Sequence, residues 1–350
     1  MDTVFLRMIK EHRERYPLME PQDYGKLAYQ SEFGAEHLAA DRQTVLEFLL
    51  EELKALSAEA SPRVPEEIGG GLCRFPLTAC PTEAEAELLA DLFLRTAEKS
   101  RGTAEGLLDK MNQIAVHRIP GMPEWFAAWN QNGCPPVHHS ESYRNAYAPH
   151  YRLLQKDFAA YFPALAEINR LVRTGRCAII GIDGRCGSGK THFTQLACDL
   201  FPCNVIHMDD FYLPAEKRQQ HWEEIPGGNI DLVRLYTEVL LPLRENRQIV
   251  YRPYSCEKGA ITEEKALPYR NVTVIEGSYS HHPKLLAGYD LKIFLDCGKE
   301  EQKRRLKARE GSYYTEFVNR WIPMEERYFQ RYRVEEECDL RVDTSEILYE

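Results

Sequence analysis

The chain has 350 residues, of which 43% are hydrophobic and 28% are charged, and its formal net charge at pH 7 is −10. This composition is ordinary for a globular protein long enough for two domains with separate cores. The sequence contains no run of about 18 apolar residues, the length that spanning a bilayer requires. Residues 1–150 hold the excess of acid, with 15 Lys and Arg against 23 Asp and Glu. Such a surface repels phosphate backbones, so we expect no nucleic-acid partner for that half.

The N-terminal half predicts a mostly helical domain, residues 1–150. Asp41 can cap a helix whose leucines recur at helical spacing. Thr82 and Glu85 form the T-x-x-E capping-box pattern ahead of a second amphipathic helix. The sequence assigns no role to this domain.

Two further segments belong to this half: a loop within the helical domain and a connector that follows it. Residues 61–76 are rich in Pro and Gly and predict a loop. Residues 151–174 predict a helical connector to the second half, interrupted at Pro163. The first residues of the chain have neither the basic start nor the apolar middle of a signal peptide, so we expect a cytoplasmic protein with no membrane partner.

Histidines and a cysteine gather in the loop-rich end of the helical domain. A zinc site there would use Cys134, His138 and His139, with His117 or His150 as a further ligand. These residues have no recognised ligand spacing, so a polar loop is the simpler interpretation. The ten cysteines of the chain include no C-x-x-C pair, and we expect reduced thiols.

Aromatic and polar residues close to this loop also have two interpretations. Trp125, Phe126 and Trp129 recur at helical spacing, which is more typical of core packing than of a nucleobase platform. Residues 30–37 and 138–152 combine His37, which lies outside the residues described below, with His139, Ser140, Glu141, Tyr143 and Arg144, and could form a second site. Capping and loop hydrogen bonds explain these segments more simply.

After Arg176 the periodicity changes to short apolar runs separated by helical or loop-rich stretches. This spacing predicts an α/β domain, residues 175–350, with a parallel sheet and helices on both faces. Ligands bind at the carboxyl edge of such sheets, and acidic residues fall at the strand ends there. The runs are 177–183, 204–210, 272–277, 291–296 and 338–343, and the acids at their ends include Asp183, Asp209, Asp210, Glu276 and Asp296.

The segment 181–191, GIDGRCGSGKT, fits the Walker A pattern G-x-x-x-x-G-K-[ST] between a predicted strand and a predicted helix. In a P-loop of this kind, glycines let backbone N–H groups face the phosphates of a nucleotide, and the helix N-terminus adds its positive end. Lys190 would reach the β- and γ-phosphates and Thr191 would ligate Mg²⁺. The predicted nucleotide-binding residues are Gly184, Arg185, Cys186, Gly187, Ser188, Gly189, Lys190 and Thr191.

Two acidic segments follow the P-loop at the same predicted edge. In HMDDFYLP, residues 207–214, we assign Asp209 as the base that accepts a hydroxyl proton and Asp210 a supporting role toward Mg²⁺ or the acceptor. Glu276 can hold Mg²⁺ through water. Both segments could instead be strand ends with solvated acids.

The segment KEEQKRRLKARE, residues 299–310, predicts a helix directly after a strand. Arg304, Arg305 and Arg309 could close over a triphosphate and neutralise the charge that develops during transfer. An exposed helix with i,i+4 pairs, such as Glu300 with Arg304 and Glu301 with Arg305, is the alternative.

Together, GIDGRCGSGKT, MDDFY, VIEG and RRLKARE resemble the uridine kinase and phosphoribulokinase group of P-loop kinases, over about residues 175–342. The resemblance implies that Asp209 is the catalytic aspartate before the Phe-Tyr pair and that the three arginines form the lid. It also implies a substrate-binding region formed by Asp210, Tyr212, Arg252 and Tyr254.

The acceptor region departs from the uridine kinase pattern. Residues 251–262 lack the histidine that uridine kinases place against the base, although Tyr254 could stack and Arg252 could meet an anionic acceptor. Asn229 and Asp231 could line the acceptor pocket or cap the helix that begins there.

The resemblance implies an enzyme that uses ATP and Mg²⁺ to phosphorylate a hydroxyl group of a small molecule such as a nucleoside, sugar or vitamin-like compound. A homo-oligomer is compatible with this interpretation. The alternatives are a regulatory NTPase in which hydrolysis moves the helical domain, and a binding module without turnover. Asp209 favours the kinase, because a carboxylate base suits an alcohol.

Overall fold

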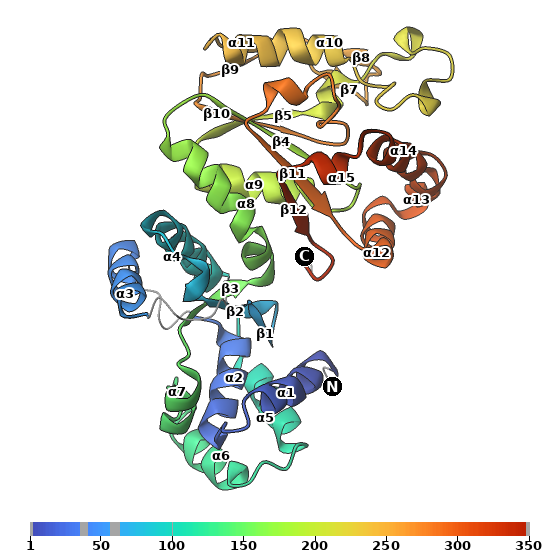
Figure 1. Ribbon diagram of the computed structural model, residues 1–350. Coiled ribbons are helices and arrows are strands. Elements are labelled where there is room, and N and C mark those ends of the chain that lie inside the picture. Colours follow the sequence, from blue (N-terminus) through green and yellow to red (C-terminus); the bar gives the residue numbers. More distant parts are fainter. Residues whose placement is uncertain (1–2, 36–40, 57–63, 100, 348–350) are drawn as a thin grey trace. The chain divides into compact units, whose positions relative to one another are not determined.

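The structure, a computed structural model, describes residues 3–35, 41–56, 64–99 and 101–347. The chain forms two compact units: one runs to Ala159 and includes Ile347, and the other extends from Ala160 to Glu346 (Figure 1). The division falls inside helix α8 (Lys156–Arg173), between the predicted boundaries at residues 150 and 174. In the part of the chain that is described, no helix is both long and apolar enough to cross a bilayer.

The first unit is mostly helical, as its periodicity predicts, and contains a small antiparallel sheet with the strand order β1-β2-β3. Both predicted caps are confirmed, because the Asp41 side chain accepts from the Thr44 N–H and Thr82 and Glu85 form a reciprocal capping box. Its elements are α1 (Thr3–Arg15), α2 (Pro21–Phe33), α3 (Arg42–Ala55), β1 (Glu66–Gly69), β2 (Leu72–Pro76), η2 (Leu77–Ala79), α4 (Glu83–Glu98), α5 (Ala104–Ala115), α6 (Met122–Gln131), α7 (Glu141–Tyr147) and β3 (Tyr151–Gln155).

The sheet corrects two predictions. The predicted loop 61–76 contains a β-hairpin, because Gly69, Gly70 and Gly71 all adopt positive φ and make the turn between β1 and β2. Residues 151–155, predicted as helix, form strand β3, which pairs with β2. Helix α8 then runs through Pro163 without interruption.

The aromatic residues of α6 pack inside the first unit, as predicted. The rings of Trp125 and Trp129 stack with their centroids 5.0 Å apart. Trp129 is buried, and its Nε1–H donates to the Pro135 carbonyl at 2.8 Å. Gly25 of α2 lies against Trp125 so closely that a Cβ there would be 2.1 Å from the ring. Packing therefore accounts for this cluster.

The second unit confirms the predicted α/β fold, since all five predicted runs form strands of one parallel sheet. The strand order is β12-β11-β4-β10-β5. The strands are β4 (Ala178–Gly184), β5 (Cys203–His207), β10 (Val272–Glu276), β11 (Leu291–Asp296) and β12 (Leu340–Asp343).

Helices cover both faces of this sheet (Figure 1). On one face, Phe193 of α9 (Lys190–Leu200) packs edge-on against Tyr161 of α8, with centroids 5.0 Å apart. The other face forms a buried cluster in which Ile179, Ile206 and Ile275 meet α14 (Ile322–Tyr332) and the helical segment 232–244. That segment consists of α10 (Leu232–Leu235), the π-helical η6 (Tyr236–Leu240) and α11 (Leu241–Arg244).

The remaining elements of the second unit are short. They comprise η3 (Met208–Phe211), η4 (Ala215–Lys217), η5 (Trp222–Glu224), β6 (Ile249–Tyr251), β7 (Tyr254–Ser255), β8 (Ala260–Ile261), β9 (Lys265–Leu267), η7 (Leu286–Gly288), α12 (Lys299–Glu310), η8 (Gly311–Tyr313), α13 (Tyr314–Glu316), η9 (Phe317–Trp321) and α15 (Val334–Glu337).

Candidate functional site

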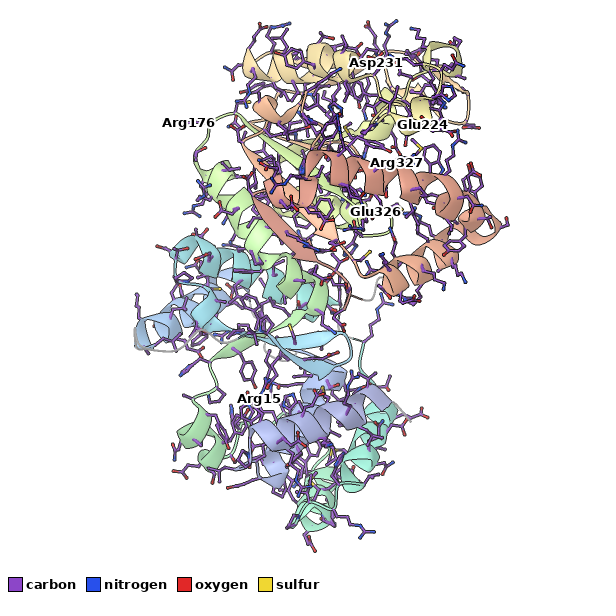
Figure 2. The ribbon with its side chains drawn as sticks, turned by 45° about the vertical axis from the view of Figure 1, so that its right-hand side comes forward. Arg15, Arg176, Glu224, Asp231, Glu326 and Arg327 are labelled. Carbon is purple, nitrogen blue, oxygen red and sulfur yellow. The ribbon has the colours of Figure 1, made fainter. Side chains whose placement is uncertain are left out.

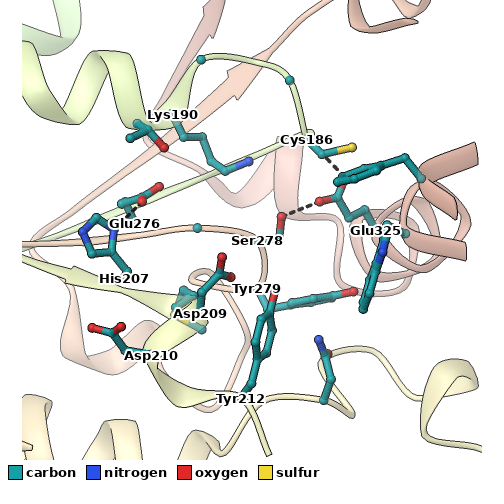
Figure 3. A pocket seen from close by; sticks show the side chains of 18 of the residues that line it. Cys186, Lys190, His207, Asp209, Asp210, Tyr212, Glu276, Ser278, Tyr279 and Glu325 are labelled. Atoms are coloured by element: carbon teal, nitrogen blue, oxygen red, sulfur yellow. Dashed lines mark hydrogen bonds and ion pairs between the residues drawn. The ribbon is translucent and has the colours of Figure 1, made fainter. Parts of the chain in front are cut away.

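A cavity of about 660 Å³ lies at the carboxyl edge of strands β4, β10 and β5 (Figure 3). Because these strands are parallel neighbours, the segments that follow them meet at one place. The residues that line the cavity are Cys186, Gly187, Gly189, Lys190, Thr191, His192, His207, Met208, Asp209, Asp210, Tyr212, Asn229, Glu276, Gly277, Ser278, Tyr279, Arg309, Phe317, Trp321 and Glu325.

The loop after β4 has the backbone of an anion cradle. Gly184, Gly187 and Gly189 adopt positive φ, and a Cβ on Gly184 would lie 2.0 Å from the Leu295 carbonyl oxygen. Helix α9 begins at Lys190, so its free N–H groups and positive dipole end face the cavity. The Lys190 Nζ donates to the Gly184 carbonyl at 2.6 Å, which folds this side chain over its own loop.

The side chain of Arg185 is turned away from the cavity. Its guanidinium forms ion pairs with Asp296 at 2.6 Å, Glu326 at 2.7 Å and Glu335 at 2.5 Å. Ser188 is buried below the loop and does not line the cavity. Of the predicted nucleotide-binding residues, these two can therefore contribute only through their backbone.

The acids at the strand ends divide into structural and cavity-facing groups. Asp183 is completely buried and accepts from the Gly184 N–H at 2.7 Å and the Tyr328 hydroxyl at 2.7 Å. Asp296 binds Arg185 and Arg341. Both hold the fold together. The cavity-facing acids are Asp209, Asp210 and Glu276.

Asp209 lies on η3, directly after β5, and Figure 3 shows its carboxylate pointing into the cavity. Desolvation by the surrounding protein raises the pKa of Asp209 above its usual range, although a hydrogen bond from Tyr212 opposes the shift. The neighbouring Asp210 accepts a hydrogen bond from the Tyr251 hydroxyl at 2.7 Å. Each carboxylate thus accepts from a tyrosine hydroxyl, Asp209 from Tyr212 and Asp210 from Tyr251, and the raised pKa of Asp209 makes it the candidate base.

Glu276 and His207 form a pair that the sequence analysis missed. They occupy the same register position on the adjacent strands β10 and β5, and the His207 Nδ1 lies 2.6 Å from a Glu276 oxygen. This hydrogen bond raises the pKa of His207. Only the strand order brings the two together, so neither residue type nor spacing could have shown the pair.

The three predicted lid arginines have different surroundings. Arg304 is half-exposed and pairs with Glu301. Arg305 is buried, pairs with Glu301 at 2.7 Å as the alternative predicted, and donates to the Gly187 carbonyl at 3.1 Å. Arg309 lines the cavity. A role as lid residue therefore fits Arg309, whereas Arg305 supports the loop from behind.

The predicted acceptor residues also differ in whether they line the cavity. Tyr212 lines the cavity, but Arg252 and Tyr254 do not. Arg252 is exposed, and Tyr254 contacts Tyr212 edge-on with centroids 6.2 Å apart. Asp231 caps α10 by accepting from the Arg234 N–H. These three therefore lie behind or beside the cavity.

Asn229, by contrast, lines the cavity and is 2% exposed. Its main-chain carbonyl accepts from the Leu213 N–H at 2.8 Å, which fixes the backbone. Among the residues that the structure describes, none forms a hydrogen bond with its Oδ1. Of the two roles that the sequence left open, Asn229 therefore lines a pocket and does not cap helix α10.

The far wall of the cavity consists of residues that the sequence analysis did not predict. Phe317 and Trp321 come from the π-helical η9, and the Glu325 carboxylate of α14 accepts from the Cys186 N–H at 3.0 Å and from the Ser278 hydroxyl. Single-turn π-helices are frequent at functional sites. In the sequence these aromatics resemble ordinary core positions.

A loop around η5 packs beside this wall. Arg320 lies over the rings of Trp222 and Trp321, at 5.0 and 5.2 Å from their centroids, and pairs with Glu223 at 2.5 Å. Arg327 of α14 donates to the Glu223 carbonyl at 2.6 Å, and Figure 2 shows this arginine beside the loop. Arg320 and Arg327 therefore link the η5 loop to η9 and α14.

The polar segment of the first unit forms hydrogen bonds, as the simpler interpretation predicted. His139 binds Asp23 at 2.9 Å and the Tyr151 hydroxyl at 2.7 Å. The Ser140 hydroxyl donates to Asp23 at 2.6 Å, and the Cys134 thiol lies 3.5 Å from an Asn130 oxygen. All ten cysteines are free thiols. Within the described residues, no group of three or more His, Cys, Asp or Glu side chains is arranged to hold a metal ion.

No family model and no curated protein matches the chain. Among solved structures, a possible uridine kinase from Bacillus stearothermophilus is 21% identical, with a TM-score of 0.41 over 52% of this chain and 100% of that one. A provisionally assigned fructose transport system kinase from Silicibacter sp. TM1040 is 19% identical, with a TM-score of 0.40 over 51% of this chain and 98% of that one. The motif resemblance likewise covers about half of the chain.

Proposed function

We propose that the protein is an ATP-dependent phosphotransferase that phosphorylates a hydroxyl group of a small molecule. The observation that carries this proposal is a single cavity with a glycine cradle and helix N-terminus on one wall and Asp209, a carboxylate of raised pKa, on another. A phosphate donor and an alcohol need these two features at one place.

The cradle suits the phosphates of ATP. Loop N–H groups and the Lys190 ammonium would bind them, and Arg309 would add a second positive charge from α12. Thr191 and Glu276 supply the hydroxyl and carboxylate oxygens that Mg²⁺ prefers. Because Mg²⁺ keeps several waters and phosphate oxygens as ligands, two protein ligands are sufficient. Bound there, it would neutralise phosphate charge.

Asp209 would take the proton of the acceptor hydroxyl. Its raised pKa makes the carboxylate a better base. The Tyr212 hydroxyl, hydrogen-bonded to Asp209, would hold the carboxylate in position. The sheet fixes the base through β5, so proton acceptance and phosphate binding are both built on rigid elements.

The test compares two neighbouring carboxylates. Asp209→Asn keeps the shape and removes the base, and we expect kcat to fall about 10²-fold or more with ATP affinity nearly unchanged. Asp210→Asn, the matched control, should have the smaller effect, because Asp210 is bound to Tyr251. The assay is ADP release in the presence of a panel of hydroxyl compounds. ADP release that no acceptor accelerates would instead indicate the regulatory NTPase.

A further inference from the structure

We propose that the acceptor is an uncharged polyhydroxyl compound, of monosaccharide or nucleoside size, and that Asn229 is a specificity-determining residue for it. This inference depends on the proposed function. It concerns the part of the cavity away from the P-loop, which no sequence motif defines.

The charges that line the cavity are unevenly distributed. Its two permanent cations, Lys190 and Arg309, belong to the phosphate side, because Lys190 starts α9 and α12 packs through Leu306 against Gly187. The other side carries Asp209 and Asp210, and His207 beside them is already paired with Glu276. A phosphate or carboxylate on the acceptor would therefore lie against carboxylates without a free counterion, which like-charge repulsion disfavours.

The arginines nearest to this side have other partners. Arg252 is exposed outside the cavity, so it does not provide the anion contact that the sequence suggested. Arg234 pairs with Glu238 at 2.8 Å, and Arg320 pairs with Glu223 and Glu316. Arg218 donates to the Leu213 carbonyl at 2.9 Å. None of these four lines the cavity.

The lining groups of the acceptor side suit hydroxyl groups on a ring. Carboxylates accept hydrogen bonds from hydroxyls, and aromatic faces pack against the apolar surface of a sugar or base. Tyr212, Tyr279 and Trp321 supply such rings. Burial raises the pKa of both tyrosines, so their hydroxyls stay neutral; Tyr279 can donate or accept, and Tyr212, which donates to Asp209, can still accept.

Asn229 is the unpartnered polar group of this wall. A buried polar atom without a partner is destabilising, and native proteins contain few of them. The Asn229 amide, with its Oδ1 unpaired and its backbone fixed, is such a group on the cavity wall. An acceptor hydroxyl can both donate to an amide and accept from it, so it satisfies this side chain at no electrostatic cost.

The experiment measures acceptor-dependent ADP release by the full chain with matched pairs: D-ribose and ribose 5-phosphate, uridine and uridine 5′-monophosphate, D-glucose and D-gluconate. We expect the uncharged member of at least one pair to be phosphorylated with kcat/KM about 10²-fold or more above its anionic partner. An equal or higher kcat/KM for an anionic partner overturns the inference and leaves the kinase intact. Absence of acceptor-dependent release across the panel contradicts the proposed function itself.

Variants then test Asn229 with the accepted compound. Asn229→Ala should raise the acceptor KM about tenfold or more, with the KM for ATP unchanged. Arg252→Ala, the matched control, should change neither value. A larger effect of Arg252→Ala on the acceptor KM would overturn the assignment of the acceptor wall.

Discussion

Each unit contains a cluster of ionisable side chains around an aspartate, and the two aspartates behave in opposite ways. In the first unit, burial would raise the pKa of Asp23, but hydrogen bonds from His139 and Ser140 outweigh it and lower the pKa. In the second unit, Asp209 is exposed to a cavity, and desolvation by the surrounding protein outweighs the hydrogen bond from Tyr212 and raises its pKa. The same residue type is thus a structural acceptor in one unit and a candidate base in the other.

The comparison shows what separates a site from a polar core. The Asp23 cluster is closed: Asp23 is 0% exposed and its partners are bound to it. The first unit does have an apolar groove of about 450 Å³, but it is lined by residues such as Leu53, Leu77 and Pro81 and not by this cluster. The Asp209 cluster borders a cavity. Access, and not the number of charges, makes the difference.

The largest expected effect is that of Lys190→Ala. Removing the phosphate-facing charge should lower kcat/KM for ATP about 10²- to 10³-fold, while the thermal transition stays in place, since the lysine bonds only to its own loop. Arg304→Ala, exposed on α12, is the control and should behave as wild type. Steady-state kinetics measure kcat/KM for both variants. Normal turnover by Lys190→Ala would contradict the distinction between the closed Asp23 cluster and a functional Asp209 cluster.

Asp23→Ala should have the opposite profile and affect the stability of the protein instead of its turnover. It leaves His139 and Ser140 without their buried partner, so the free energy of unfolding of the first unit should fall by about 3 kcal/mol. Asp41→Ala, which removes an exposed helix cap, should cost about 1 kcal/mol. Urea denaturation measures both. If Asp23→Ala is stable but inactive, the closed cluster has a functional role that its geometry does not indicate.

A smaller effect concerns pH. The raised pKa of His207 means that its pair with Glu276 stabilises the fold fully below the ordinary imidazole pKa of about 6.5, and that this contribution is lost as pH rises through the higher folded value. The Tm should therefore decline over this window in wild type and be flatter in His207→Gln. Identical profiles would show that the pair carries no charge.

The smallest effect should come from removing the first unit. A chain that begins at Lys156 retains all of α8, including Tyr161, which packs on Phe193. We expect it to remain folded and to keep the ATP affinity of the full chain. A chain that begins at residue 165 lacks Tyr161 and should be less stable. Calorimetry and nucleotide titration compare them; a molten product in both cases would show that the units are not independent.

The sequence predicted the parts of the molecule that depend on local pattern. The five parallel strands, the P-loop between β4 and α9 and the caps at Asp41 and Thr82 follow from periodicity and short motifs. The hairpin β1–β2 was missed, because a glycine run reads as a loop unless its pairing is known.

The rest of the candidate site depends on tertiary arrangement. His207 meets Glu276 only because β5 and β10 are neighbours, and Glu325 reaches Cys186 from 139 residues away along the chain. Arg305 is long and charged, yet its side chain is buried under the loop, where it donates to the Thr344 hydroxyl. No sequence spacing indicates this contact. Sequence motifs thus predicted the loop and helix proposed to bind phosphates, whereas the residues proposed for the acceptor side were found only from the structure.

The distribution of tryptophan gives the protein a built-in optical probe. Trp125 and Trp129 stack on each other in the first unit, whereas Trp321 lines the cavity of the second unit and Trp222 lies against Trp321. With Phe in place of Trp125 and Trp129, all indole emission would arise beside the acceptor wall, because the chain has four tryptophans. A compound that displaces water from Trp321 would shift that emission, so acceptor binding is visible by fluorescence without a label and before any turnover.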